Sequence, residues 1–371
     1  MAPMRSLMFA VLSLLLASCR SATVAVTAPP PLPDFAAAVP LCPASYCRPL
    51  HASLATSDRG ICVVRADGRA FCWGDGVDMD EHEVPVAMDG LTDVVQVSMA
   101  SPWRGVSEHC LLRRTGEVRC WGDHRYDRLA PPSSGNARAI PMSIAGLPPA
   151  VEVRAIGGVS CAIDESGALF CWTEKLPEPF IVSGTGPVAH LSNYGDCIVR
   201  RDGTVACASE PPRSPRPLEW STVAGITNAV HVVDLFTFHC AFLASGDPVC
   251  WDTRDGTNPI PTPGLRGAVD FVGSPHDDDS GLLQPALVGY VLRRDGAVGW
   301  TDNARRADGT KVLDGLAGGV AIAGETSFAC VLRAKDEVWC RGQRWVLGLS
   351  SRTGSPLTGD VDQPARVILP P

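Results

Sequence analysis

Short runs in which apolar and polar residues alternate, separated by turn residues, recur along most of the chain. Examples are VVQVSMA at 94–100, VEVRAIGG at 151–158 and GVAIAGE at 319–325. A period of two residues is typical of strands with one buried face, whereas an amphipathic helix has a period of 3.6 residues. The sequence also holds 36 glycines and 32 prolines, which favour turns over long helices. The pattern therefore predicts an all-β protein built from many short strands.

One motif follows these alternating runs in seven copies. The first copy, CVVRADGRAFCW, begins at Cys62, and the others begin at Cys110, Cys161, Cys197, Cys240, Tyr290 and Cys330. The copies recur roughly every 45 residues, and each is followed by a short strand, as in PVAM at 85–88 and PARVIL at 364–369. Four strands in each of seven units predict a seven-bladed β-propeller.

Each copy is predicted to be a β-hairpin with a three-residue loop. Such a loop needs a residue in the left-handed region at its end, where glycine is favoured. That position holds Gly68, Gly116, Gly167, Gly203, Gly246, Gly296 and, in the seventh copy, Asp336. With the first loop at 66–68, Cys62 faces Cys72 as a non-hydrogen-bonded pair, whose Cα atoms are about 4.5 Å apart. This spacing is within reach of a disulfide.

The fifteen cysteines are then all assigned. The predicted hairpin disulfides are Cys62–Cys72, Cys110–Cys120, Cys161–Cys171, Cys197–Cys207, Cys240–Cys250 and Cys330–Cys340. A local loop is expected between Cys42 and Cys47, and Cys19 is the candidate for lipidation. Metal binding and buried free thiols are the alternatives, but two ligands on one hairpin lack the spacing of a zinc knuckle.

The N-terminus has the features of an export signal. A short apolar run, SLMFAVLSLLLA, follows Arg5 and is too short to span a bilayer. The segment LASC at 16–19 resembles the lipobox of bacterial lipoproteins, which implies cleavage after residue 18 and acylation of Cys19. An ordinary signal peptide with an incidental cysteine remains the alternative. We thus expect a signal at 1–18, a lipidated, proline- and alanine-rich tether with a small cysteine loop at 19–48, and the propeller at 49–371.

Charge and motifs narrow the function classes. A net charge of −8 with a pI near 5.5 argues against a nucleic-acid-binding protein. The sequence lacks GxSxG, HExxH, P-loop and CxxC patterns, so no enzyme, cofactor or metal site is predicted. Acidic residues gather at 78–83 and 276–279, and could bind calcium, but solvated acidic loops are the favoured interpretation.

The repeat resembles that of the regulator of chromosome condensation family, whose members are seven-bladed propellers. The segments WGDG at 73–76, WGDHRYDRLA at 121–130 and RGQRWVLGL at 341–349 are similar to that family's WG-containing segment, and the resemblance covers 49–371. Known members include a nucleotide-exchange factor, a secreted β-lactamase inhibitor and an ultraviolet-B photoreceptor that uses clustered tryptophans. Here the recurring tryptophans are expected to pack between blades: Trp73, Trp121, Trp172, Trp251 and Trp300.

These features predict a monomeric, lipid-anchored recognition scaffold in the bacterial envelope, with the outer membrane favoured because Arg20 follows the lipidated cysteine. Its partner would be a protein or an envelope polymer. In a four-stranded meander the hairpin tips emerge on one side, and the other two loops of each blade on the opposite side, where recognition is expected. The predicted binding residues are Trp103, Arg104, Arg125, Tyr126, Tyr194, Phe238, Trp345, His276, Asp277, Asp278 and Asp279. The alternatives are an extracytoplasmic hydrolase or lyase, or an enzyme inhibitor acting through the same face.

Overall fold

The computed structural model describes most of the repeating region. The described residues are 54–57, 60–74, 82–88, 90–100, 108–122, 141–173, 175–235, 238–253, 259–276, 286–343 and 360–370. All of them belong to one compact unit, Asp34–Pro371. The predicted signal, the tether, Cys19, Cys42 and Cys47 lie outside the described residues. Within the described part, no helix is long and apolar enough to cross a membrane.

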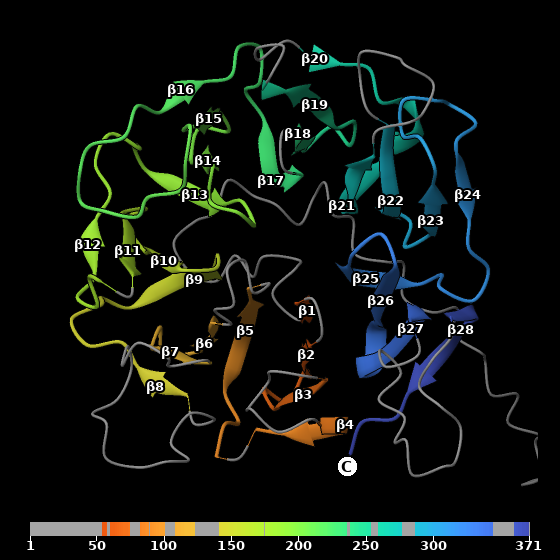
Figure 1. Cartoon of the computed structure of the whole chain (residues 1–371), viewed down its shortest axis with the longest axis horizontal. Helices are drawn as coiled ribbons and strands as arrows, with labels where there is room; N and C mark the ends of the chain where they lie inside the picture. Colours follow the sequence, from red (N-terminus) through yellow and green to blue (C-terminus); the bar gives the residue numbers. More distant parts are fainter. Residues whose placement is uncertain are drawn as a thin grey trace, which may run out of the picture. The chain divides into compact units, whose positions relative to one another are not determined.

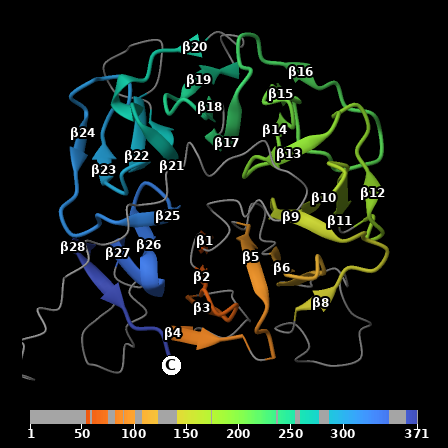
Figure 2. The same cartoon turned by 180° about the vertical axis from the view of Figure 1, so that it is seen from behind.

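The strands form seven four-stranded sheets, which we number as blades 1 to 7 (Figures 1 and 2). Blade 1 holds β1 (Leu54–Thr56), β2 (Gly60–Val64), β3 (Ala70–Gly74) and β4 (His82–Ala87). Blade 2 holds β5 (Val94–Met99), β6 (Glu108–Arg113), β7 (Val118–Gly122) and β8 (Met142–Ser143). Blade 3 holds β9 (Ala150–Ala155), β10 (Val159–Asp164), β11 (Leu169–Thr173) and β12 (Phe180–Ile181). Blade 4 holds β13 (Val188–Leu191), β14 (Cys197–Arg200), β15 (Val205–Cys207) and β16 (Ser221–Thr222).

The other three blades follow the same plan. Blade 5 holds β17 (Ala229–Leu235), β18 (Phe238–Leu243), β19 (Val249–Asp252) and β20 (Pro259–Ile260). Blade 6 holds β21 (Ala268–His276), β22 (Ala286–Arg293), β23 (Val298–Thr301) and β24 (Thr310–Val312). Blade 7 holds β25 (Gly319–Gly324), β26 (Phe328–Arg333), β27 (Glu337–Gln343) and β28 (Asp360–Val367). Two short 3-10 helices, η3 (Pro263–Leu265) and η4 (Ala334–Asp336), complete the described elements.

The blades form a closed ring, and the predicted seven-bladed propeller is confirmed. In every sheet the strands pair antiparallel in chain order, so each blade is one continuous stretch of sequence. The first strand of each blade lies on the inner side of the ring, and the fourth lies outside (Figure 1). The inner strand β25 of the last blade contacts β1 of the first. The ring therefore closes by packing between complete blades and not by exchange of a strand between the chain ends.

The predicted hairpin register is confirmed in the pairing of the strands. Cys62 faces Cys72 and Val63 faces Phe71, while Arg65 N–H donates to the Arg69 carbonyl at 2.9 Å. The loop residue expected in the left-handed region has positive φ in all seven blades, from 61° at Asp336 to 96° at Gly246. A Cβ at Gly68 would also approach the Thr92 carbonyl oxygen to 2.3 Å, so this glycine serves both the turn and the adjacent segment.

Six cysteine pairs lie at disulfide distance in the expected hairpins, with Cα–Cα separations of 4.0 to 4.1 Å. The tryptophan after the second cysteine covers the disulfide of the preceding blade. Trp121 of blade 2, for example, belongs to the same buried cluster as Cys62 and Cys72 of blade 1. Trp172 is likewise clustered with the disulfide of blade 2. The Cys-Trp sequence thus combines a bond within one blade and a contact to its neighbour.

Trp300 packs against the apolar cluster of blades 6 and 7, as expected, but it does not occupy the repeat position of the other four tryptophans. It pairs with Tyr290, the residue that stands in place of the first cysteine, and therefore occupies the position of the second cysteine. The two rings make an edge contact with centroids 4.7 Å apart. Thr301, which is fully buried, takes the position of the interblade tryptophan. In blade 6 an aromatic pair replaces the disulfide across the hairpin.

Candidate functional site

The sequence-predicted binding residues fall into two groups in the structure. Eight of them lie outside the described residues: Trp103, Arg104, Arg125, Tyr126, Asp277, Asp278, Asp279 and Trp345. His276 is the last residue of β21, and its side chain is likewise not described. Tyr194 and Phe238 are described, and they differ from each other in exposure. The structure therefore brings together none of the predicted set as a surface, and those positions stay predictions.

Phe238 was predicted on the binding face, but its side chain is fully buried. It is the first residue of β18 and packs in the cluster between blades 5 and 6 with Phe271 and Leu287. The Arg305 guanidinium lies over its ring, 5.4 Å from the centroid. The first residue of β18 faces blade 6, so Phe238 is a packing residue. Tyr194 is half-buried, in the loop between β13 and β14.

The hairpin tips, which include three Arg-Arg pairs, are held within the chain. The first arginine of the pair bonds the segment that enters its own blade: Arg200 Nε donates to the Thr185 carbonyl at 2.7 Å, and Arg293 Nη1 donates to the Arg266 carbonyl at 2.7 Å. In two of the pairs the second arginine reaches the tip of the preceding blade: Arg201 Nη2 donates to the Glu165 carbonyl, and Arg294 Nη2 donates to the Ala244 carbonyl at 3.1 Å. These guanidinium groups join neighbouring blades.

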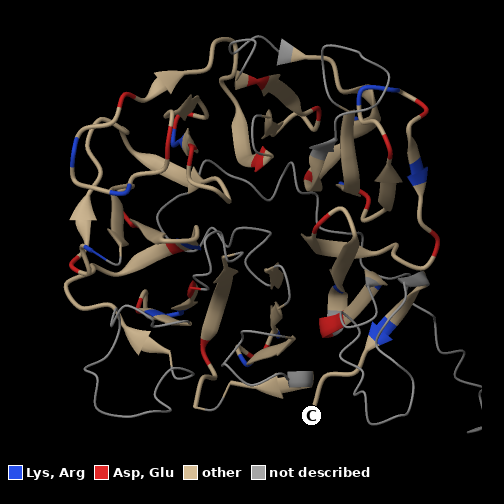
Figure 3. Cartoon of the chain, viewed as in Figure 1, with Lys and Arg blue, Asp and Glu red and all other residues tan. Residues whose placement is uncertain are grey.

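Blades 7 and 1 are joined at the same end. Asp336 Oδ1 accepts a 2.8 Å hydrogen bond from Ala66 N–H, and its other oxygen lies 3.8 Å from Arg65 Nε. Acidic and basic positions are interspersed around the ring in the described residues (Figure 3). The tip side is thus a set of local contacts between tips and entering segments, and its arginines do not form a basic patch.

A chain of polar side chains runs between blades 2 and 6 along the inner strands. We name it the polar belt; its members are Gln96, Glu152, His190, His231 and Asp270. Each directly follows a one-residue register shift in its inner strand. A β-bulge re-aims the side chains that follow it, which explains why these positions in successive strands are directed toward one another. All five belt residues are buried.

The belt members are linked from blade to blade. Gln96 exchanges two hydrogen bonds with the Val153 backbone, at 2.9 and 3.0 Å. Glu152 Oε2 lies 3.1 Å from His190 Nδ1, His190 Nε2 lies 2.7 Å from His231 Nδ1, and His231 Nε2 lies 3.4 Å from Asp270 Oδ1. The first two of these links are hydrogen bonds, and each needs one proton from an imidazole, because an ionised carboxylate supplies none. The third is an approach at ion-pair distance.

The charge of Glu152 is balanced within the belt. Burial raises the pKa of its carboxyl, but the His190 and Arg154 charges and hydrogen bonds to His190 and Leu191 outweigh burial, so that the pKa falls to about 2. Arg154 Nε donates to Glu152 Oε1 at 3.0 Å. Buried charges are tolerated when they are paired and hydrogen-bonded. The belt is therefore a compensated network that ties five blades together.

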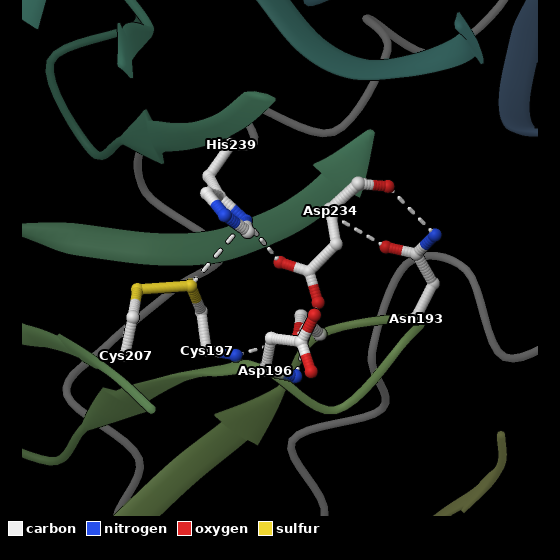
Figure 4. Close-up of a disulfide and its surroundings, with 7 residues drawn as sticks. Asn193, Asp196, Cys197, Cys207, Asp234 and His239 are labelled. Carbon is white, nitrogen blue, oxygen red and sulfur yellow. Dashed lines mark hydrogen bonds and ion pairs between the residues drawn. A yellow bond between two sulfur atoms is a disulfide. The ribbon is translucent and has the colours of Figure 1, made fainter. Parts of the chain in front are cut away.

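A second polar group lies between blades 4 and 5, which we name the acid–imidazole cluster: Ser192, Asn193, Asp196, Asp234 and His239 (Figure 4). Asp234, near the end of β17, is its centre. Its Oδ1 lies 2.8 Å from His239 Nδ1, and its Oδ2 accepts hydrogen bonds from the Ser192 hydroxyl and, at 3.2 Å, from Asp196 N–H. Asn193 exchanges two hydrogen bonds with the Asp234 backbone, at 2.7 and 3.0 Å. The cluster thus fixes the loop that carries Tyr194.

Asp196 is the one carboxyl in this cluster whose pKa rises. Burial and the neighbouring Asp234 carboxylate raise the pKa of Asp196 to about 7, against smaller lowering effects of His239 and Arg213. Its buried Oδ1 has no hydrogen-bond partner among the residues that the structure describes. The protonated acid is favoured because the carboxyl is buried beside the Asp234 carboxylate, and it is Asp234 that bonds the His239 imidazole. Asp196 can therefore hold a proton near neutral pH.

Among the described residues, two groups of three potential metal ligands lie close together: Glu108, Cys110 and Cys120, and Cys197, Asp234 and His239. Their cysteines are the sulfurs of the hairpin disulfides, and the thiolate is the form that binds metals. Neither group offers a thiolate ligand in the oxidised chain.

Sequence reasoning missed both polar groups, although a signal for the belt is present. The inner strands carry one polar residue at the same repeat position between apolar neighbours, as Glu152 in AVEVRA and His231 in AVHVVDL. Aligning the inner strands in addition to the hairpins would have placed these residues side by side. The cluster has a weaker signal, because its members come from a loop and two strands of different blades.

Comparisons with known proteins establish the fold. No protein-family model matches the sequence, and no curated protein matches it. Yeast RCC1 (Prp20) bound to Kap60 has a TM-score of 0.58 at 14% identity, over 82% of this chain and 85% of that chain. Prp20p from Saccharomyces cerevisiae gives the same score and identity, over 82% and 87%. PorZ from Porphyromonas gingivalis has a TM-score of 0.51 at 12% identity, over 79% of this chain and 37% of that chain. The expected resemblance is thus shown at the level of an RCC1-like propeller fold.

Proposed function

We propose that the chain is a non-catalytic recognition scaffold that binds a protein or an envelope polymer through the loop side of the propeller, opposite the hairpin tips. The observation that carries this proposal is the difference between the two sides. On the tip side, arginines such as Arg200 and Arg294 are engaged by backbone carbonyls of the same chain. On the loop side, the segments between strands range in length from two residues at 236–237 to the much longer segment 123–141. Variable loops on a rigid scaffold are where recognition usually resides.

Proteins of similar fold supply precedents for binding. The yeast RCC1 structure is a complex with Kap60, and Prp20p is described with its binding to Gsp1p and histones. PorZ is described as a bacterial surface component of the type-IX secretion system. At these identities the likeness extends to fold alone, so the partner of this chain is set by its own loops.

The cysteines and the N-terminus support a location outside the cytoplasm. Six disulfides are typical of an oxidising, extracytoplasmic environment. Together with the lipobox-like LASC segment, they support an exported chain that is anchored in the bacterial envelope through Cys19, with the outer membrane favoured. If this is right, Cys19→Ser removes lipid labelling and either stalls processing or releases the propeller from the membrane fraction.

An enzyme is the alternative, and the acid–imidazole cluster is the place to consider it. Asp196, Asp234 and His239 combine a perturbed pKa with an acid–imidazole pair, which is a common feature of catalytic sites. However, Ser192 and Asp234 are 0% exposed and His239 is 3% exposed. A substrate on the surface does not reach these groups, so the scaffold is the better-supported function.

Site-specific photo-crosslinking separates the two sides. A photoreactive residue in place of half-buried Tyr194 reports on the loop side, and one in place of exposed Asp202 reports on a hairpin tip. Both variants are expressed in full length and irradiated in cells of the host. We expect one crosslinked species from position 194 that is absent at position 202. Crosslinking of that species from the tip alone, or equally from both positions, contradicts the proposal.

A further inference from the structure

The disulfide of blade 4 differs from the other five in its accessibility. Eleven of the twelve cysteines in the hairpin disulfides are 0 to 2% exposed. The exception is Cys207, which is half-buried and is the last residue of β15. Its partner Cys197 is 0% exposed. Of the two residues of this disulfide, only Cys207 has exposed surface, while Cys197 lies inside the protein.

The buried sulfur of this disulfide is next to an acid–imidazole pair. Cys197 Sγ lies 3.5 Å from His239 Nδ1, and the same nitrogen lies 2.8 Å from Asp234 Oδ1 (Figure 4). The indole of Trp251 stacks on the imidazole, with ring centroids 5.5 Å apart and planes inclined by 29°, and keeps it in this orientation. The ring nitrogen that bonds Asp234 is thus held against the sulfur that faces away from solvent.

Other blades carry parts of this arrangement but not the whole. At the same repeat position blade 3 has Ser160, whose hydroxyl lies 3.7 Å from Cys110 Sγ. Blade 2 has His109 there, but the residue paired across from it is Met99, where blade 5 has Asp234 across from His239. Cys110–Cys120, with Ser160 as its neighbour, is therefore an internal control for the blade 4 disulfide.

We propose that Cys197–Cys207 is a thiol–disulfide exchange site for a dithiol reductant, with His239 as the acid that protonates the departing sulfur and Asp234 as its positioning residue. One thiolate of the dithiol attacks Cys207 Sγ and forms a mixed disulfide. The bonding electrons pass to Cys197 Sγ, which takes the Nδ1 proton of the His239 imidazolium and leaves a neutral imidazole.

The second thiolate of the reductant then completes the exchange. It attacks the reductant's own sulfur in the mixed disulfide, and Cys207 leaves as a thiolate that is protonated by water. The dithiol is oxidised to a disulfide by two electrons, and the cysteine pair is reduced. Exchange rates depend on access to the attacked sulfur and on the ease with which the other sulfur leaves. Cys207 provides the access, and His239 assists the departure.

The first test compares the disulfides within one molecule. The full-length chain, solubilised in detergent, is treated with dithiothreitol without denaturant, the free thiols are alkylated at intervals, and each cysteine is mapped by mass spectrometry. We expect Cys197–Cys207 to be reduced at least about tenfold faster than Cys110–Cys120. Equal rates, or reduction of all pairs together, overturn the proposal.

The second test examines the proton donor. His239→Gln is expected to slow reduction of Cys197–Cys207 by about tenfold while the rate at Cys110–Cys120 is unchanged. If this variant does not fold, the pH profile of the unaltered chain decides. After correction for the thiolate fraction of dithiothreitol, the rate constant at Cys197–Cys207 falls as the imidazole loses its proton, and that at Cys110–Cys120 stays flat. A flat profile at both pairs rejects the role of His239.

Discussion

The polar belt and the acid–imidazole cluster are built from the same residue types but hold charge in different ways. In the belt, two histidines lie between Glu152 and Asp270, and the Arg154 guanidinium also bonds Glu152. In the cluster, the one imidazole bonds Asp234, and Asp196 is buried beside that carboxylate. The pKa of Glu152 falls to about 2, whereas that of Asp196 rises to about 7.

The difference shows that burial alone does not decide how a carboxyl titrates. Glu152 is the more deeply buried of the two acids, yet it is the one that stays ionised. What separates them is the number of positive groups within hydrogen-bond reach. Glu152 is therefore favoured in its charged form and Asp196 in its protonated form. Replacing each acid by its amide should change the free energy of unfolding in opposite directions.

The largest effect is expected for Glu152→Gln, which removes the charge that the belt compensates. It should lower the free energy of unfolding at pH 7 by about 3 kcal/mol. Because the folded pKa lies below the unfolded value of 4.5, the stabilisation is complete above about pH 5 and is lost as the pH falls toward 2. Denaturation curves with the disulfides intact measure the difference between variant and parent. The exposed Glu178, changed to Gln, is the control and should have no effect.

A smaller effect of opposite sign is expected for Asp196→Asn, which mimics the protonated acid. Because the folded pKa is raised, the carboxyl costs nothing below pH 4, and its cost grows as the pH rises toward 7. We expect the variant to be more stable than the parent by about 2 kcal/mol at pH 7 to 8, allowing for solvent screening. The two should be equally stable near pH 4. Destabilisation at pH 8 would show that the carboxylate is needed in its charged form.

The smallest effect concerns Ser192 of the acid–imidazole cluster, compared with Ser98 in the inner strand that carries Gln96. Ser192 accepts a hydrogen bond from Cys197 N–H at 3.0 Å and donates to Asp234, whereas Ser98, at the same repeat position, accepts from Ala155 N–H at 3.0 Å. Ser192→Ala should cost about 1 kcal/mol more than Ser98→Ala, because it also removes a bond to a charged acceptor. Thermal unfolding of the two variants side by side measures this difference. Equal costs would show that the serine adds nothing to the cluster.

The features that the sequence predicted correctly depend on residues that lie close together in the chain. The hairpins, the left-handed residue at 68 and at 336, and the pairing of Cys62 with Cys72 all depend on spacing within a dozen residues. Trp300 was misplaced because the glycine before it was aligned with a cysteine, although its ten-residue distance from Tyr290 already indicated the cysteine position.

The polar groups could not be predicted because they arise between blades. His190 and His231 are 41 residues apart in the chain and 2.7 Å apart in the ring. Phe238 was expected at the surface because it follows a loop, but the strand it opens faces the next blade. The distances that create these sites exist only after the ring has closed.

The order of the disulfides has a consequence for how the protein is made. Each of the six joins a cysteine to the next cysteine along the chain, ten residues later. A polypeptide that emerges into an oxidising space from its N-terminus presents the two partners of each pair before any thiol of the following blade. Closing such a short loop takes tens of nanoseconds, far less than the addition of ten residues. An oxidase that joins thiols in the order in which they emerge therefore makes the six hairpin disulfides.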